Sequence, residues 1–122
     1  MKIVRRDVRD VTILDLEGDI VVGDDSLHQE IEKLTREDRL KVVLNLAKLT
    51  YADSDGFGEI CRAWRNIAGA RKIRGRLKLL SPQGQIEVVL ANTKLFSIFE
   101  TYKDEPGALA SFADLSEITA HS

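Results

Sequence analysis

Short apolar segments alternate along this chain with longer segments in which apolar residues recur every three or four positions. The short segments are typical of strands, and the longer spacing is typical of amphipathic helices. From end to end, the pattern predicts elements in the order ββαβαβαβα. Because a helix between two strands normally joins parallel neighbours, we expect an α/β fold with a mixed four- to five-stranded sheet and helices packed against it.

The N-terminal segment is expected to form a hairpin and then a helix. The segments KIVRRDV and VTILDLEG are apolar enough to pair as two antiparallel strands. The stretch Asp24–Ser26 offers candidate N-cap residues, and Gln29 stands three positions after Ser26, as in a capping box. These signals predict a helix over residues 25–38.

A buried central strand and a second helix are expected next. Residues 40–46 are short and rich in β-branched side chains, which is typical of a strand covered on both faces. The segment TYADSDGFG then resembles a turn. From Ser54 onward the apolar spacing predicts a helix that ends between Gly69 and Lys72.

The C-terminal part predicts a strand, a helix, a strand and a closing helix. The first strand is expected over residues 76–81, with Ser81 as the cap and Pro82 as the first residue of the helix that follows. Residues 96–99 and 101–102 are expected to form the last strand. The closing helix starts near Asp104 and carries an apolar stripe of Ala108, Leu109, Phe112 and Leu115.

The length and composition narrow the classes of protein to which this chain can belong. The 122 residues are expected to form one domain, 1–122, with a formal net charge of −2. The longest apolar run has four residues, whereas a membrane-spanning helix needs about 18 or more. The charged N-terminus MKIVRRDVRD does not resemble a signal peptide, so we expect a cytoplasmic protein. One cysteine and two histidines offer no metal-ligand set, so no metal or cofactor is expected.

The most informative segment is the junction between residues 44–46 and the helix that starts at Ser54. A hydroxyl group at a helix N-terminus lies beside free backbone N–H groups and the positive end of the helix dipole. A phosphate on Ser54 would therefore find donors already in place. Gly56 and Gly58 would let another protein approach closely. The ordinary alternative is that Asp53 or Ser54 only caps the helix.

The sequence DSDGFG after VVLNLAKLTY resembles the D-S-x-G-x-G signature of STAS domains, the family of bacterial anti-sigma factor antagonists. The resemblance implies that the chain is a regulator and not an enzyme. It implies binding to an anti-sigma factor with serine kinase activity, and release when Ser54 is phosphorylated. The residues expected to contact this partner are Asp19, Asp53, Ser54, Asp55, Gly56, Phe57 and Gly58. An alternative is a STAS module that serves, without phosphorylation, in a transport complex or one that handles lipids or small ligands.

Two positions depart from the family pattern. Many members carry a second hydroxyl residue where this chain has Asp55, whose charge would oppose the addition of a phosphate or partly imitate it. Members also often carry an acidic residue where this chain has Val21. We therefore expect part of the surface that faces the kinase to differ.

Basic residues gather between Arg62 and Lys78 without an acidic neighbour. They could follow a phosphate backbone, but the only aromatic residue of this run, Trp64, is assigned to the core face. A solvated helix end and loop is the expected reading, with no direct binding of nucleic acid. Cys61 lies on the apolar face, and no nucleophile is paired with a base in the sequence, so no catalytic residue is expected.

Overall fold

The computed structural model describes residues 1–69, 76–94 and 97–113. Within these residues the element order is ββαβαβαβα, as the sequence predicts. The strands form one five-stranded sheet in the order β1-β2-β3-β4-β5. β1 runs antiparallel to β2, and the other neighbouring strands are parallel, which confirms the expected mixed α/β fold. The strands are β1 (Lys2–Val8), β2 (Val11–Ile20), β3 (Lys41–Ala52), β4 (Arg76–Leu80) and β5 (Thr101–Tyr102).

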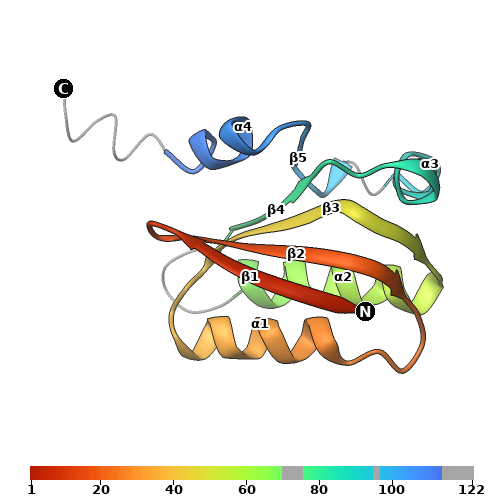
Figure 1. Ribbon diagram of the computed structural model, residues 1–122, viewed down its shortest axis with the longest axis horizontal. Helices are drawn as coiled ribbons and strands as arrows, with labels where there is room; N and C mark the ends of the chain where they lie inside the picture. The colour runs from red at the N-terminus through yellow and green to blue at the C-terminus, as the bar shows by residue number, and fades with distance from the viewer. Residues whose placement is uncertain (70–75, 95–96, 114–122) are drawn as a thin grey trace.

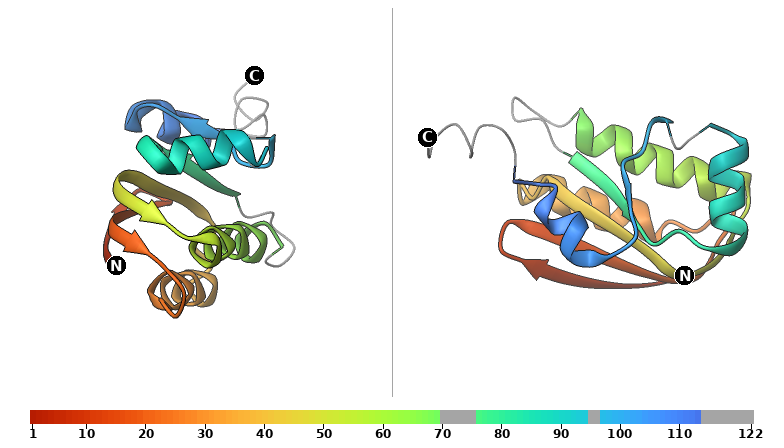
Figure 2. Two further views of the ribbon diagram at one scale, coloured as in Figure 1. Left: turned by 90° about the vertical axis from the view of Figure 1, so that its right-hand side faces the viewer. Right: turned by 90° about the horizontal axis from the view of Figure 1, so that it is seen from above.

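The helices lie on both sides of this sheet. α1 and α2 cover one face, and α4 lies over part of the opposite face (Figures 1 and 2). α3 stands at the end of the sheet where β3 finishes and α2 begins (Figure 1). The helices are α1 (Ser26–Arg36), α2 (Ser54–Ala68), α3 (Gly84–Asn92) and α4 (Glu105–Ala110).

Side chains of β3 alternate between the two faces, as strand geometry requires. Val42, Leu44 and Leu46 belong to the main core under α1 and α2. Val43 points the other way and joins a smaller cluster, in which Ala108 and Phe112 are also buried. The main core therefore lies between the sheet and α1 and α2, and α4 closes a second, smaller one.

The face that carries α4 becomes polar where that helix does not cover it. Asp15 of β2 accepts hydrogen bonds from Arg6, at 2.6 and 3.0 Å, and from Asn45, at 2.8 Å. Arg6 also donates to Glu105 of α4, at 2.7 Å. The guanidinium of Arg6 holds the pKa of Asp15 below its ordinary value. A charged network thus borders the smaller core and attaches α4 to the sheet.

Two predictions about strands were wrong. β3 continues to Ala52, through residues expected in a turn, because the end of β2 extends beside it and pairs Asp19 with Tyr51. Residues 97–99 form no strand: the backbone turns there, and Phe99 is buried with its ring 6.2 Å from that of Trp64. Residues 95 and 96 lie outside the described part of the chain.

The predicted helix starts also need correction. The N-cap of α3 is Gln83 rather than Ser81, whose hydroxyl donates instead to the Lys103 carbonyl at 3.0 Å. Pro82 therefore precedes the helix. The capping box at α1 is wrong too, because the N-cap is Asp25 and the Ser26 N–H donates to Oδ1 of Asp24 at 3.0 Å rather than to Gln29, whose amide donates to Asp25 at 3.2 Å. The closing helix is confirmed over Glu105–Ala110, and Leu115 lies outside the described residues.

Candidate functional site

Ser54 is the first residue of α2 and is exposed. The residue before it, Asp53, is the N-cap and uses both carboxylate oxygens. Its Oδ1 accepts from the Gly56 N–H at 2.7 Å, and its Oδ2 accepts from the Val22 N–H at 3.0 Å. The predicted capping role is thus confirmed for Asp53. Because Asp53 caps the helix, the Ser54 hydroxyl is not needed for this purpose.

The start of α2 has the electrostatic character expected for an anion site. The first N–H groups of a helix lack intrahelical acceptors, and the Asp53 carboxylate accepts from that of Gly56. The helix dipole adds partial positive charge at the same place. Asp55 lies in this first turn and is exposed, so its carboxylate already provides a negative charge beside Ser54. A phosphoryl group on Ser54 would experience both the favourable helix end and the repulsion from Asp55.

The two glycines of the motif have different surroundings. Gly56 is buried, and a Cβ atom built on it would lie 2.1 Å from the carbonyl oxygen of Ile20. Glycine is required there so that α2 can approach the end of β2. Gly58 is exposed and a Cβ on it would meet nothing within 4 Å. Only Gly58 therefore leaves room for another molecule.

Phe57 is also buried, with 7% of its surface exposed, and packs in the main core. Gly56 and Phe57 were both predicted to contact a partner. Their burial places both beneath the surface, where they position the helix. The exposed residues of the predicted set are Asp19, Ser54, Asp55 and Gly58, and Asp53 is half-buried.

Three exposed apolar side chains accompany Ser54; of these, the sequence pointed to Val21 as a departure from the family pattern but not to Val22 or Tyr51. Val22 is 68% exposed, Tyr51 is 44% exposed and Val21 is 38% exposed. Val22 is held beside the helix start by its hydrogen bond to Asp53, and Tyr51 lies two residues before that aspartate. We call Val21, Val22 and Tyr51 the apolar rim. The Val-Val pair directly before Gly23 was the available sequence signal.

Gln85, which was not predicted from the sequence either, connects α3 to this site. The Ala52 N–H donates to Oε1 of Gln85 at 3.2 Å, and Nε2 of Gln85 donates to the Ala52 carbonyl at 3.0 Å. The side-chain amide of Gln85 therefore pairs with the last residue of β3 much as a neighbouring strand would. Beside the rim, the Thr50 hydroxyl donates to Asp19 at 2.7 Å. These three hydrogen bonds fix the end of β3, immediately before Ser54.

The basic run does not form one solvated face. Arg62 is exposed and pairs with Glu59 at 3.3 Å, as expected of a helix surface. Lys78, in contrast, has 4% of its side chain exposed, pairs with Glu100 at 2.8 Å and donates to Ser111. The solvated reading is therefore wrong for Lys78, which holds the end of α4 against β4. Arg71, Lys72 and Arg74 lie outside the described residues.

The remaining candidates show ordinary structural roles. Burial raises the pKa of the Cys61 thiol, which disfavours the reactive thiolate. His28 lies 3.0 Å from Glu32 on the same helix. Among the described residues, no three His, Cys, Asp or Glu side chains are grouped to hold a metal ion. In the same part of the chain, no helix is both long and apolar enough to cross a membrane.

Known proteins resemble this chain over most of its length. A search of curated proteins gave no match. A solved structure from Thermotoga maritima, assigned as an anti-sigma factor antagonist, has 22% identity and a TM-score of 0.78, with 92% of this chain and 95% of that chain covered. An anti-sigma factor antagonist from Mycobacterium paratuberculosis has 16% identity and a TM-score of 0.80, with coverages of 93% and 94%.

Two further structures show where the same fold occurs. The Bacillus cell fate determinant SpoIIAA in its phosphorylated form has 18% identity and a TM-score of 0.64, with 87% of this chain and 96% of that chain covered. A murine Solute Carrier 26 anion transporter has 10% identity and a TM-score of 0.63, and this chain covers 18% of it. The family model described as the STAS domain matches residues 2–108. The chain therefore belongs to the STAS domain family.

Proposed function

We propose that this chain is a single-domain anti-sigma factor antagonist of a partner-switching pathway, a regulator and not an enzyme. It binds an anti-sigma factor that has serine kinase activity, and phosphorylation of Ser54 releases this partner. The observation that carries the proposal is the exposed Ser54 hydroxyl at the start of α2, beside the apolar rim. The similarity to SpoIIAA, solved in unphosphorylated and phosphorylated forms, supports it.

The surroundings of Ser54 suggest how one phosphate changes binding. The apolar rim offers contact area that gains from burial, and Asp19, Ser54 and Asp55 lie among the polar groups around it. A phosphate adds a charge of about −1.5 to −2 to Ser54. Buried in a contact surface, this charge loses hydration, and it also lies beside Asp55. Phosphorylation therefore weakens a complex that the unmodified rim supports.

The test is incubation with the cognate anti-sigma factor kinase and ATP, followed by mass spectrometry. One phosphate should appear on Ser54, and Ser54→Ala should remove it. Ser97→Ala is the matched control, because Ser97 is also exposed but lies far from α2 in sequence. Phosphate on another serine or on threonine, with Ser54 unmodified, would contradict the assignment.

A binding titration tests the rim separately from the phosphate. Val22→Ser should weaken binding of the unmodified chain to the kinase because it removes the most exposed apolar side chain of the rim. Val88→Ser is the control, since Val88 is 56% exposed on α3 and lies outside the rim. Equal losses in both variants would argue against a contact centred on Ser54.

Asp55 determines how readily the switch works. Its carboxylate repels the incoming phosphoryl group, so Asp55→Ser should be phosphorylated faster than the wild type. If Asp55 imitates phosphate, the same variant should also bind the kinase more tightly. A time course and a titration on the two proteins measure both effects. An unchanged rate and affinity would limit Asp55 to stabilising the helix start.

The similarity to part of an anion transporter favours one alternative, a STAS module that acts within a transport complex without phosphorylation. The two functions predict different results for one experiment. A transport module should show no phosphate on Ser54 with any kinase encoded nearby, and Ser54→Asp should leave its partner binding unchanged. A partner switch should lose binding in Ser54→Asp.

A further inference from the structure

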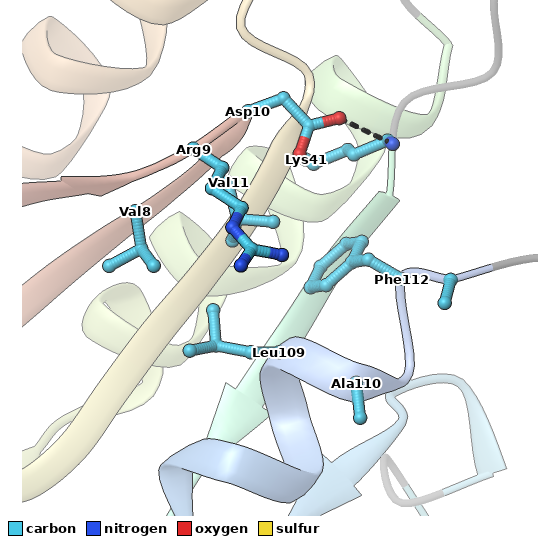
Figure 3. A pocket seen from close by; sticks show the side chains of 9 residues that line it. Val8, Arg9, Asp10, Val11, Lys41, Leu109, Ala110 and Phe112 are labelled. Carbon is cyan, nitrogen blue, oxygen red and sulfur yellow. Dashed lines mark hydrogen bonds and ion pairs between the residues drawn. The ribbon is translucent and has the colours of Figure 1, made fainter.

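A cavity of about 500 Å³ (Figure 3) lies beside the turn between β1 and β2, at the other end of the sheet from the start of α2 (Figure 1). The turn between β1 and β2, the first residue of β3, and α4 with the residues after it enclose this cavity. Its apolar surface comes from Val8, Val11, Leu109 and Phe112. A volume of roughly 300–1,000 Å³ with mostly apolar walls is typical of small-molecule sites.

Three charged side chains line the cavity, and two of them neutralise each other. Nζ of Lys41 lies 2.7 Å from Oδ2 of Asp10, and this hydrogen bond lowers the pKa of Asp10. The guanidinium of Arg9 has no hydrogen-bond or ion-pair partner among the described residues. Figure 3 shows that it points into the space between Leu109 and Phe112. Among the described residues, the lining therefore presents one positive charge without an acidic partner.

The backbone fixes the position of Arg9 in the hairpin turn, where the residue is exposed. Val8 and Val11 pair across the hairpin, so Arg9 and Asp10 are its two turn residues. Arg9 has a φ of 58°, in the left-handed region that glycine adopts readily and that costs another residue about 1–2 kcal/mol. Its carbonyl accepts a hydrogen bond from Arg39 at 3.0 Å. A positive φ is what a two-residue hairpin requires of a central residue, so the turn places Arg9 at the edge of the cavity.

We propose that this cavity binds a small amphipathic monocarboxylate. The carboxylate pairs with Arg9, whose fork of N–H donors matches two carboxylate oxygens. The apolar part of the ligand covers Val8, Leu109 and Phe112. One unbalanced cation fits one negative charge, whereas a nucleotide or polyphosphate would need several donors. This site is independent of Ser54 and of the proposed switch.

The test is an amide NMR titration of the full chain with hexanoate and, in parallel, with hexanamide. The two probes have the same apolar part, and only hexanoate carries the charge that Arg9 recognises. Hexanoate should shift the signals of residues 8–11 and 109–113 in a saturable way, and it should bind at least about tenfold more tightly than hexanamide. Equal affinities, or no saturable shift at these residues, would overturn the proposal.

Two variants test separately whether binding requires the charge of Arg9 and whether it requires the open space of the cavity. Arg9→Gln should lower the hexanoate affinity about tenfold, whereas Arg36→Gln, a loss of the same charge on α1, should leave it unchanged. Ala110→Phe places a ring at the cavity wall and should abolish binding while Arg9 is retained. Equal effects of the two arginine variants, or full binding in Ala110→Phe, would overturn the site. Arg9-dependent dimerisation in sedimentation would also overturn it, by assigning the cavity to a second copy.

Discussion

The two faces of the sheet are closed in different ways. Beneath α1 and α2, buried apolar side chains extend along β2 and β3 from Leu14 and Val42 to Ile20 and Ala52. On the other face the buried cluster is short, and charged contacts of Arg6 and Lys78 attach α4 beside it. Apolar packing sustained along whole strands stabilises the fold, whereas a short patch edged by ion pairs stabilises one attached helix. We therefore expect global stability to depend on the first face and local opening to occur at the second.

The largest effect should come from Gly56→Ala, at the closest approach on the face of α1 and α2. The added Cβ would lie 2.1 Å from the Ile20 carbonyl oxygen, and overpacking of this kind costs roughly 1–3 kcal/mol. We expect the upper part of this range because the obstacle is backbone. Urea unfolding measures the loss. Gly58→Ala is the control, and it should be slightly stabilising because a Cβ there meets nothing and alanine favours a helix.

The comparison between the faces is tested most directly by Val42→Ala and Val43→Ala. The two valines are adjacent, both are 0% exposed, and they belong to opposite clusters. Each change removes two methylene equivalents, worth about 0.8 kcal/mol apiece. Val42→Ala should lose more, because α1 and α2 cannot move in to fill the space, whereas α4 can shift. Equal losses in urea unfolding would show that both faces are packed with the same rigidity.

Arg6→Gln should produce a smaller loss, of about 1 kcal/mol or less, because the pairs of Arg6 are partly exposed. Its main effect should be local: amides of residues 108–112, which α4 and its contacts protect, should exchange with solvent faster than in the wild type. Arg36→Gln removes an exposed pair on α1 and should change neither quantity. Unchanged exchange in Arg6→Gln would mean that Phe112 alone holds α4 in place.

The smallest expected effect is on the folding stability at acid pH. The pKa of Asp15 lies below its ordinary value of 3.8, chiefly through the hydrogen bond from Arg6. A lowered folded-state pKa means that the pair contributes fully above the unfolded value and that this contribution disappears as the pH falls through the folded value. Between about pH 5 and pH 2, the wild type should therefore lose more stability than Arg6→Gln. Parallel acid curves would show that Asp15 contributes nothing through this pair.

The elements could be predicted because periodicity records which side chains face the core. Ser54 could be singled out because the strand end, the helix start and the DSDGFG motif coincide there. The contact of Gly56 with Ile20 and the pairing of Gln85 with Ala52 could not be predicted, since each joins residues whose proximity depends on the folded sheet. The full length of β3 could not be predicted for the same reason, because Tyr51 belongs to the strand only through its pairing with Asp19.

The two bonds that Asp53 accepts also bear on the phosphorylation of Ser54 that we propose. Transfer of a phosphoryl group to a hydroxyl requires a group that orients the hydroxyl and accepts its proton. Asp53 is the carboxylate directly before Ser54, but turning either oxygen toward this hydroxyl would break the bond to Gly56 or the bond to Val22. Asp53 is therefore not free to act as that base. In the switch that we propose, the base for transfer to Ser54 would have to come from a group other than Asp53.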